Sequence, residues 1–296
     1  MSPESSEAAP IGVFDSGVGG LSVLRALQAE LPHEHFVYLA DNGHAPYGER
    51  GDAFVAARTH AIAGHLRRAH GIKALVVACN TATAAAIHEA RASHPGLPVV
   101  GVEPALKPAV AATRTGRVGV IATRGTLASG KFGRLLDSLR SQAEFIVQPC
   151  DGLAHAIEQA VAEGLAGATA AAEIEALCTM YMRAMGRFGT ETGAIDTLVL
   201  GCTHYVFAES VLQRLAGHGV RLVETGEPVA RQTRRLLAQA GLLASAPGGG
   251  ALQLLTTGDP GLPRAAAARW LRGPARQSER VDVPAVPPAL PARRPG

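Results

Sequence analysis

The sequence is poor in aromatic and charged residues. Among its 296 residues, aromatics make up 4% and charged residues 18%, whereas 47% are hydrophobic. This hydrophobic content excludes disorder for most of the chain. With few aromatics, the core must consist mainly of Ala, Val, Leu and Ile, which suits buried parallel strands covered by Ala-rich helices. The length allows two domains of ordinary size or one large α/β domain.

Long apolar runs and an export signal are also missing. No stretch approaches the roughly 18 continuous apolar residues of a membrane span. Residues 1–10 are acidic and polar, whereas a signal peptide is basic and then apolar. We therefore expect a cytoplasmic protein that has no membrane partner.

Motifs for disulfides and metals are absent as well. The four cysteines lie far apart without a CxxC, and the eleven histidines include no HExxH. We expect free thiols and no metal site. An isolated cysteine usually fills the core, and we assign that role to Cys150 and Cys178.

The net charge of +3 resides in the C-terminal tail. From Arg264 to the end, seven arginines stand against Glu279 and Asp282, which leaves −2 for residues 1–263. We therefore expect no nucleic-acid partner, although a polyanion-binding tail stays open. The Pro- and Arg-rich residues 273–296 and the N-terminal residues 1–10 are predicted to be disordered.

Strand and helix signals alternate along the first part of the chain. The apolar periodicity predicts strands at Ile11–Phe14, Phe36–Ala40 and Ala74–Ala78, with helices at Leu21–Leu31 and Asp52–His70 between them. A Gly-rich turn, Gly17-Val-Gly-Gly, follows the first strand. This order requires a parallel sheet with right-handed crossovers.

The same order recurs in the second part of the chain. Predicted here are strands at Val118–Ile121, Glu144–Val147 and Thr197–Leu200, and helices at Leu127–Leu139 and Leu153–Arg187. Ile11-Gly-Val-Phe-Asp-Ser-Gly resembles Val118-Gly-Val-Ile-Ala-Thr-Arg-Gly, and Leu75-Val-Val-Ala-Cys-Asn-Thr resembles Leu198-Val-Leu-Gly-Cys-Thr-His. An internal duplication explains both pairs, with chance similarity between apolar strands as the alternative. The predicted fold class is α/β, with two pseudo-symmetric domains, each a mainly parallel sheet flanked by helices, and an active site in the cleft between them.

Two of the four cysteines end apolar strands. Ligands of parallel α/β sheets gather at the carboxyl ends of strands, where Cys79 and Cys202 fall. Short polar residues follow each of them, Asn80-Thr81 and Thr203-His204, and these can cap a helix and bind an anion. A free thiol has a pKa of about 8.5, and a helix N-terminus lowers it toward neutral pH. Each cysteine is thus a candidate base, with core filling as the alternative.

Two thiols on opposite sides of one cleft would suit inversion of a stereocentre. One thiolate would remove a proton from Cα, and the opposite thiol would deliver a proton to the other face. The Cα proton of an amino acid is a much weaker acid than a thiol, so the site must also stabilise the carbanion and exclude water. A closed interdomain cleft would serve both needs.

Several motifs resemble those of the glutamate racemase family of the aspartate/glutamate racemase superfamily. They are, in family order, Phe14-Asp-Ser-Gly-Val-Gly-Gly-Leu, Asp41 followed by Pro46-Tyr-Gly, Ala78-Cys-Asn-Thr-Ala, Gly101-Val-Glu-Pro and Gly201-Cys-Thr-His-Tyr. The sequence departs from the family pattern at Val206, where Pro is usual, and at Glu224-Thr225, where Asp-Ser is common.

The resemblance implies roles for ten residues. Cys79 and Cys202 would be the two proton carriers, and the substrate would be bound by Asp15, Ser16, Tyr47, Gly48, Asn80, Thr81, Thr203 and His204. Asp15 and His204 would also tune the thiols. Glu158 lies near the position of a family acid and is a weaker candidate, because the residues before it depart from the family pattern.

The resemblance also implies a function and a domain arrangement. Family members interconvert L- and D-glutamate, supply D-glutamate for peptidoglycan, need no cofactor and often form dimers. We therefore expect glutamate as the substrate, no cofactor and a homodimer. Domains exchange chain in this family, so residues 11–103 plus 221–272 would form the first domain and residues 104–220 the second.

Three other functions stay open. Gly17-Val-Gly-Gly after a strand, with Asp41 after the next, is typical of a dinucleotide-dependent oxidoreductase, but the last glycine of that fingerprint is Ser22 here. A second alternative is an aspartate racemase, another amino-acid racemase or a decarboxylase of the same superfamily, of which the decarboxylases typically keep one of the two cysteines. A non-catalytic binding module is the third, and it would still bind its ligand after both cysteines are replaced.

Overall fold

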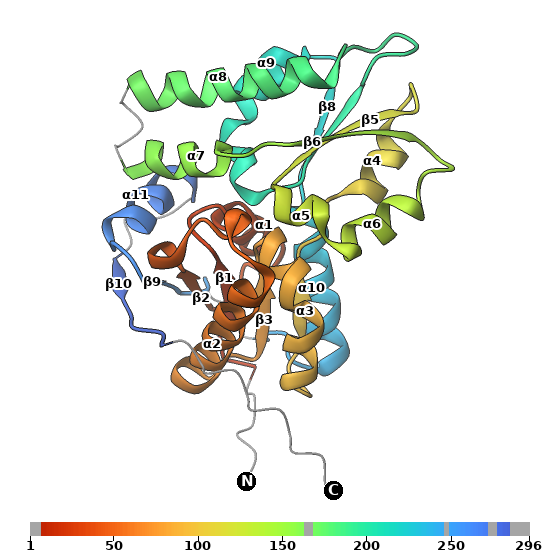
Figure 1. Ribbon diagram of the computed structural model, residues 1–296. Coiled ribbons are helices and arrows are strands. Elements are labelled where there is room, and N and C mark those ends of the chain that lie inside the picture. The colour runs from red at the N-terminus through yellow and green to blue at the C-terminus, as the bar shows by residue number, and fades with distance from the viewer. Residues whose placement is uncertain (1–6, 163–167, 246–248, 272–276, 285–296) are drawn as a thin grey trace, which may run out of the picture.

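Two parallel sheets form the framework of the computed structural model, which describes residues 7–162, 168–245, 249–271 and 277–284. The first sheet has six strands and lies in the lower half of Figure 1, and the second has four and lies in the upper half. Neighbouring strands pair in parallel in both. The predicted α/β class, with parallel sheets flanked by helices, is therefore confirmed.

The first sheet has the strand order β10-β9-β2-β1-β3-β4. These strands are β1 (Ile11–Asp15), β2 (Phe36–Ala40), β3 (Ala74–Val77), β4 (Val99–Gly101), β9 (Leu252–Thr256) and β10 (Ser278–Arg280). β1, β2 and β3 are buried along their whole length because helices cover both faces of the sheet, which explains their continuous apolar sequence.

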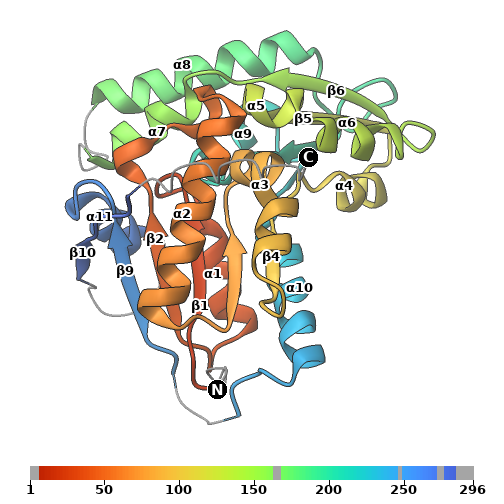
Figure 2. The same cartoon turned by 60° about the horizontal axis from the view of Figure 1, so that its bottom comes forward.

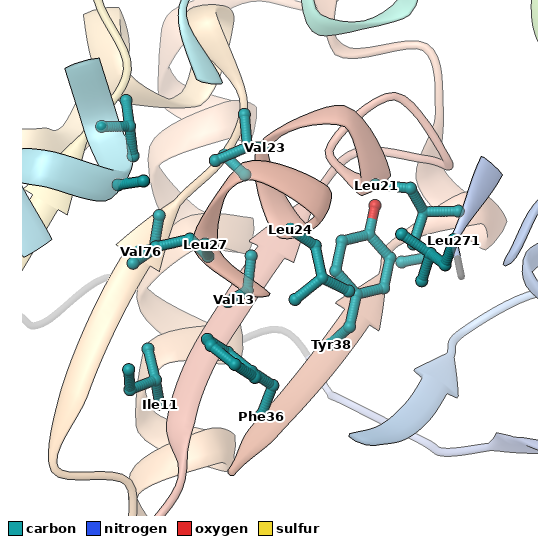
Figure 3. Packing of buried hydrophobic residues seen from close by; sticks show 14 of the residues in the cluster. Ile11, Val13, Leu21, Val23, Leu24, Leu27, Phe36, Tyr38, Val76 and Leu271 are labelled. Carbon is teal, nitrogen blue, oxygen red and sulfur yellow. The ribbon is translucent and has the colours of Figure 1, made fainter. Parts of the chain in front are cut away.

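Five helices cover the first sheet. α1 (Leu21–Glu30), α10 (Gly226–Ala240) and α11 (Gly261–Trp270) pack on one face, and α2 (Asp52–His70) and α3 (Asn80–Ser93) on the other (Figure 2). Neighbouring residues of one strand enter opposite cores. Val13 lies in the cluster that holds Leu24 and Leu27 of α1 (Figure 3), whereas Phe14 lies in the cluster on the other face.

The second sheet has the strand order β6-β5-β7-β8. Its strands are β5 (Arg117–Ala122), β6 (Glu144–Pro149), β7 (Thr197–Leu200) and β8 (Arg221–Val223). One face is covered by α7 (Leu153–Ala162), α8 (Ala168–Met185), the 3₁₀ helix η3 (Thr203–Ala208) and α9 (Glu209–Ala216), and the other by α4 (Leu106–Ala112), α5 (Arg124–Ala128) and α6 (Gly130–Asp137).

Two helices predicted as continuous are each described as a pair. The predicted helix at 127–139 is wrong in its continuity, because Ser129 ends α5 and caps α6 by accepting the Phe132 N–H at 3.1 Å. α7 and α8 stand in place of the helix predicted at 153–187, and residues 163–167 between them lie outside the described residues.

The two sheets share one topology. Strands β2-β1-β3-β4 of the first sheet have the same order as β6-β5-β7-β8 of the second, which supports the internal duplication. β8 is the fourth strand of the second unit and pairs with β7. The boundary at residue 221 was therefore wrong: a strand assigned to the first domain completes the second sheet, and the chain returns to the first sheet after Val223.

The predicted disorder of the chain ends is wrong for the residues that the structure describes. Within the tail predicted at 273–296, β10 pairs with β9 and Val283 is buried at 3% exposure. At the other end, the Pro10 carbonyl accepts the Lys73 N–H at 3.0 Å. Backbone pairing with the first sheet outweighs the polar composition of both segments. Residues 1–6, 273–276 and 285–296 of the two predicted ends lie outside the described residues.

Candidate active site

One cavity of about 200 Å³ collects the carboxyl ends of strands from both sheets. All ten residues predicted as catalytic or substrate-binding line it: Asp15, Ser16, Tyr47, Gly48, Cys79, Asn80, Thr81, Cys202, Thr203 and His204. Nine further residues complete the lining, namely Asn42, Ala45, Pro46, Thr123, Ala154, His155, Glu158, Gln159 and Leu262. Carboxyl ends of parallel strands thus form the cavity in both sheets, as this class of fold predicts.

Cys79 lies between β3 and α3 and caps the helix. Its Sγ accepts the Ala82 N–H at 3.5 Å and lies 3.7 Å from the Ser16 Oγ. The helix N-terminus lowers the thiol pKa through the Ala82 N–H, as we expected, but it does not bring the pKa toward neutral pH. Burial raises the pKa of Cys79 far above its usual value, the nearby Asp15 raises it further, and the contacts with Ala82 and Ser16 offset only part of the rise.

Cys202 follows β7 and precedes η3. Its Sγ lies 3.8 Å from Nδ1 of His204, and Nε2 of the same ring lies 2.8 Å from the Glu158 Oε2. Burial lowers the pKa of His204, but the hydrogen bonds and charges of Cys202 and Glu158 outweigh it and hold this pKa well above its ordinary value. The imidazole therefore keeps its proton beside the Cys202 sulfur near neutral pH.

Asp15 ends β1 and is fully buried. Its Oδ2 accepts the N–H groups of Gly17 at 3.2 Å and Gly20 at 2.9 Å, while its Oδ1 has no hydrogen-bond partner within the described residues. Burial raises the pKa of the Asp15 carboxyl, His204 and the two N–H groups lower it, and Glu158 raises it. An unpartnered buried oxygen at the cavity is suited to accept a hydrogen bond from a ligand.

The glycines of the turn after β1 allow the second half of the chain to approach closely. A Cβ added at Gly17 would collide with the Glu158 carboxylate, and one added at Gly19 would collide with the His204 ring. Three N–H groups of the turn are engaged, since those of Gly17 and Gly20 bond Asp15 and that of Val18 bonds Glu158 at 3.2 Å. A dinucleotide pyrophosphate would need the same donors, so the turn serves the cleft and not a nucleotide.

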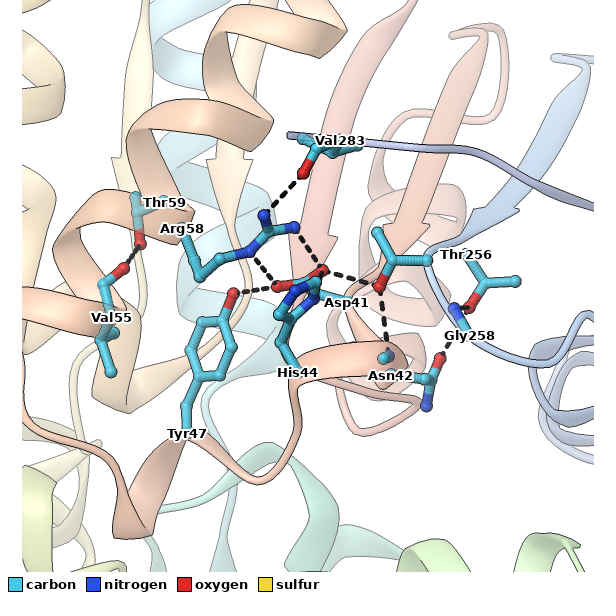
Figure 4. A network of polar contacts seen from close by, with 12 residues as sticks. Asp41, Asn42, His44, Tyr47, Val55, Arg58, Thr59, Thr256, Gly258 and Val283 are labelled. Carbon is cyan, nitrogen blue, oxygen red and sulfur yellow. Dashed lines mark hydrogen bonds and ion pairs between the residues drawn. The ribbon is translucent and has the colours of Figure 1, made fainter. Parts of the chain in front are cut away.

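The loop after β2 forms one wall of the cavity. It contains the 3₁₀ helices η1 (Asn42–His44) and η2 (Tyr47–Glu49). Tyr47 is buried at 1% exposure, and its hydroxyl donates to the Asp41 carboxylate at 2.5 Å (Figure 4). Because this hydroxyl is already engaged, Tyr47 contributes its ring and backbone to the cavity. Gly48 lies against Thr123 of the opposite half, where a Cβ would come within 3.0 Å of the Thr123 Cβ.

Polar groups without charge supply the remaining donors. Both side-chain atoms of Asn80 are buried without a hydrogen-bond partner among the described residues. The Thr81 hydroxyl lies 3.2 Å from that of Thr123, which caps α5. Neither Lys nor Arg is among the described residues that line the cavity. An anionic ligand would therefore be held by hydroxyl, amide and backbone donors and by His204.

Sequence reasoning missed Thr123 and Asn42 and held Glu158 only weakly. Thr123 follows β5 as Ser16 follows β1, so the internal duplication carries a signal that identifies it. Asn42 and Glu158 meet through a side-chain hydrogen bond across the cleft. These two residues are 116 positions apart, and no local pattern predicts such a contact.

Other kinds of site were searched for in the described parts of the chain. They contain no group of three or more His, Cys, Asp or Glu arranged to hold a metal ion. No helix in those parts is long and apolar enough to cross a membrane. Cys150 and Cys178 are buried in the core of the second sheet, as predicted, and all four thiols are free.

Comparison with known proteins agrees with this geometry. Residues 11–233 match the family model described as Asp/Glu/Hydantoin racemase. A glutamate racemase of Ectopseudomonas mendocina is 52% identical over 239 residues, which cover 81% of this chain and 86% of that protein. The crystal structure of a glutamate racemase isoform of Bacillus anthracis has a TM-score of 0.81 at 31% identity and covers 95% of this chain and 100% of its own.

A further similar structure was solved with ligands bound. Escherichia coli glutamate racemase, in complex with L-glutamate and the activator UDP-MurNAc-Ala, has a TM-score of 0.75 at 29% identity, covering 92% of this chain and 97% of its own. The resemblance inferred from the motifs is thereby confirmed. This chain belongs to the Asp/Glu/Hydantoin racemase family.

Proposed function

We propose that this protein is a glutamate racemase that interconverts L- and D-glutamate by proton transfer at Cα. The observation that carries the proposal is that Cys79 and Cys202, at equivalent strand ends of two like sheets, line one small cavity. The glutamate specificity draws on relatives that are named glutamate racemases and on a related structure solved with L-glutamate.

The two thiols divide the proton transfer between them. His204, held protonated by Glu158, lies beside the Cys202 sulfur, while burial raises the pKa of Cys79 and keeps it as the neutral thiol. The Cys202 thiolate takes the Cα proton, and the Cys79 thiol gives its proton to the opposite face of the carbanion. The bond from Cα to hydrogen breaks on one face and forms on the other. The product leaves with inverted configuration, and the reverse reaction exchanges the two roles.

The surrounding polar groups orient the substrate. Asp15 accepts a hydrogen bond from the substrate ammonium through its unpartnered Oδ1. Ser16, Asn80, Thr81 and Thr203 donate to the substrate carboxylates, and Tyr47 and Gly48 close the wall of the cavity.

The cellular role follows from the reaction. We propose that the enzyme works in the cytoplasm without a cofactor, as a homodimer, and supplies D-glutamate for peptidoglycan. The two-domain division, with its second boundary moved to follow Val223, belongs to the same proposal.

Deuterium incorporation tests the chemistry. Purified protein is incubated with L-glutamate in deuterated water, and the Cα signal is followed by NMR while optical rotation is followed in parallel. We expect deuterium at Cα together with loss of rotation, and no net inversion in Cys79→Ala or Cys202→Ala. Cys178→Ala, which removes a buried thiol away from the cavity, is the matched control and keeps activity. Inversion that persists in both single variants would end the two-thiol mechanism, and a preference for aspartate would change only the substrate.

A further inference from the structure

The carboxylate of Asp41 is the centre of a buried network beside the cavity. It is fully buried after β2 and has polar contacts with four residues from three segments of the chain (Figure 4). Its donors include the Tyr47 hydroxyl, the Arg58 guanidinium at 2.8 and 3.0 Å, and the Thr257 hydroxyl at 2.7 Å. His44 Nδ1 lies 3.0 Å from it. This carboxylate therefore joins the cavity loop to α2 and to the chain after β9.

Arg58 extends the network to the C-terminal segment. Its side chain, at 3% exposure, places Nε and Nη2 on Asp41 and Nη1 on the Val283 carbonyl at 2.6 Å. Burial alone lowers the pKa of Arg58, but the hydrogen bonds and charge of Asp41 outweigh it and the guanidinium stays charged. A planar guanidinium satisfies two acceptors at fixed angles, which a lysine ammonium at the same place cannot do.

The segment that supplies this carbonyl is itself anchored. β10 pairs with β9, and the Val281 N–H donates to the Thr256 carbonyl at 2.8 Å. The Val283 side chain is buried at 3% exposure in the same apolar cluster as Tyr47 and Leu255. The segment is therefore held by strand pairing with the sheet, by burial of Val283 in the apolar core and by the hydrogen bond from the buried Arg58 guanidinium.

We propose that residues 278–283 act as a strap that positions the cavity loop 42–49 through Arg58 and Asp41. The strap is a positioning element and not a catalytic one, because none of its residues lines the cavity. The inference rests on the proposed function, since its effect is measured on substrate binding.

The architecture predicts which kinetic constant the strap controls. Cys79 is held by β3 and α3, and Cys202 by β7 and η3, and neither pair of elements is part of the network around Asp41. Tyr47 and Gly48, which wall the cavity, lie on the loop that Asp41 holds. Loosening the strap should therefore weaken substrate binding much more than the proton transfer itself.

Two variants, each with a matched control, test the strap. Val283→Ser weakens the seat of the segment and leaves the ion pair between Asp41 and Arg58 intact, and its control is Asp282→Ser at the exposed neighbouring position. Arg58→Lys keeps the charge and loses the second acceptor, and its control is Arg67→Lys on the exposed part of the same helix. We expect KM for L-glutamate to rise about tenfold in both test variants, with kcat changed less than about threefold. Both controls should match the parent protein.

A double variant and hydrogen exchange separate positioning from general loosening. Because both substitutions loosen the same link, one at the Arg58 guanidinium and the other at the seat of the Val283 carbonyl that it binds, Arg58→Lys with Val283→Ser should raise KM no further than the worse single variant. The amides of residues 42–49 should exchange faster while those of β1 and β3 do not. KM increases that multiply, or unchanged exchange at 42–49, would overturn the strap. If the parent protein lacks racemase activity, the proposed function fails. The exchange pattern still shows whether the strap positions residues 42–49.

Discussion

The two halves of this molecule share a topology but surround their thiols differently. In the first half, Cys79 faces Ser16 and Asp15, and its thiol pKa is raised. In the second half the equivalent positions are Ala122 and Thr123, so the carboxylate after the first strand is missing. The carboxylate there comes instead from Glu158 on α7 and acts through His204.

A second difference lies directly after each cysteine. Cys79-Asn80-Thr81 corresponds to Cys202-Thr203-His204, so a hydroxyl in one half replaces an imidazole in the other. In the proposed reaction one sulfur acts as base while the other acts as acid, and the reverse reaction exchanges them, so each thiol must be able to take both states. We propose that duplication supplies the opposed geometry and that the divergence of a few side chains sets which thiol carries its proton at rest.

The largest expected difference between the halves is in the kinetic constants of variants at the residue two positions after each cysteine. His204→Gln removes the proton held beside Cys202, so we expect kcat to fall about 10²- to 10³-fold. Thr81→Val, the matched change in the first half, should raise KM about tenfold and leave kcat within about threefold, because it removes one neutral hydrogen bond. Steady-state kinetics with each enantiomer measure both. Equal losses of kcat in the two variants would mean that the two halves contribute equally to the proton transfer.

Alkylation of the thiols should reveal their different protonation. Only the thiolate reacts with iodoacetamide, and burial keeps Cys79 as the neutral thiol, so Cys79 should react about tenfold more slowly than Cys202 at about pH 7.5. Because burial raises the pKa of the Cys79 thiol, its thiolate is scarce at neutral pH and grows as pH rises. The Cys79 rate should therefore keep increasing above about pH 9.5, where the rate of an ordinary thiol with a pKa of about 8.5 levels off. Peptide mapping by mass spectrometry gives both rates. Equal rates would show that the two thiols do not differ in protonation.

A single added methyl group at the contact between the halves should lower the stability of the protein. Gly19→Ala places a Cβ against the His204 ring, so we expect unfolding to become easier by about 1–3 kcal/mol, with a lower kcat. Gly51→Ala is the control, because nothing lies within 4 Å of an added Cβ and its φ of −68° suits alanine. Thermal unfolding checks both changes. An unaltered midpoint for Gly19→Ala would show that the halves are not closely packed at this turn.

Much of the candidate site was predictable because it follows from local patterns. Apolar runs that end at Cys79 and Cys202 identify strand ends, and parallel strands bring such ends to one edge of a sheet. All ten predicted residues consequently line the same cavity. Glu158 was held only weakly and Asn42 was missed, since their contact joins α7 to the loop after β2 across the cleft.

The sequence by itself determined the alternation of strands and helices, the duplication and the two thiols, because periodicity and turn chemistry act over a few residues. Only the tertiary structure decided that Arg221–Val223 completes the second sheet and that Val283 reaches Arg58. It also decided the direction of the Cys79 pKa, since desolvation depends on how many distant segments bury the sulfur. Strand pairing and burial depend on contacts between segments that are distant in the sequence, so no local stretch of sequence predicts them.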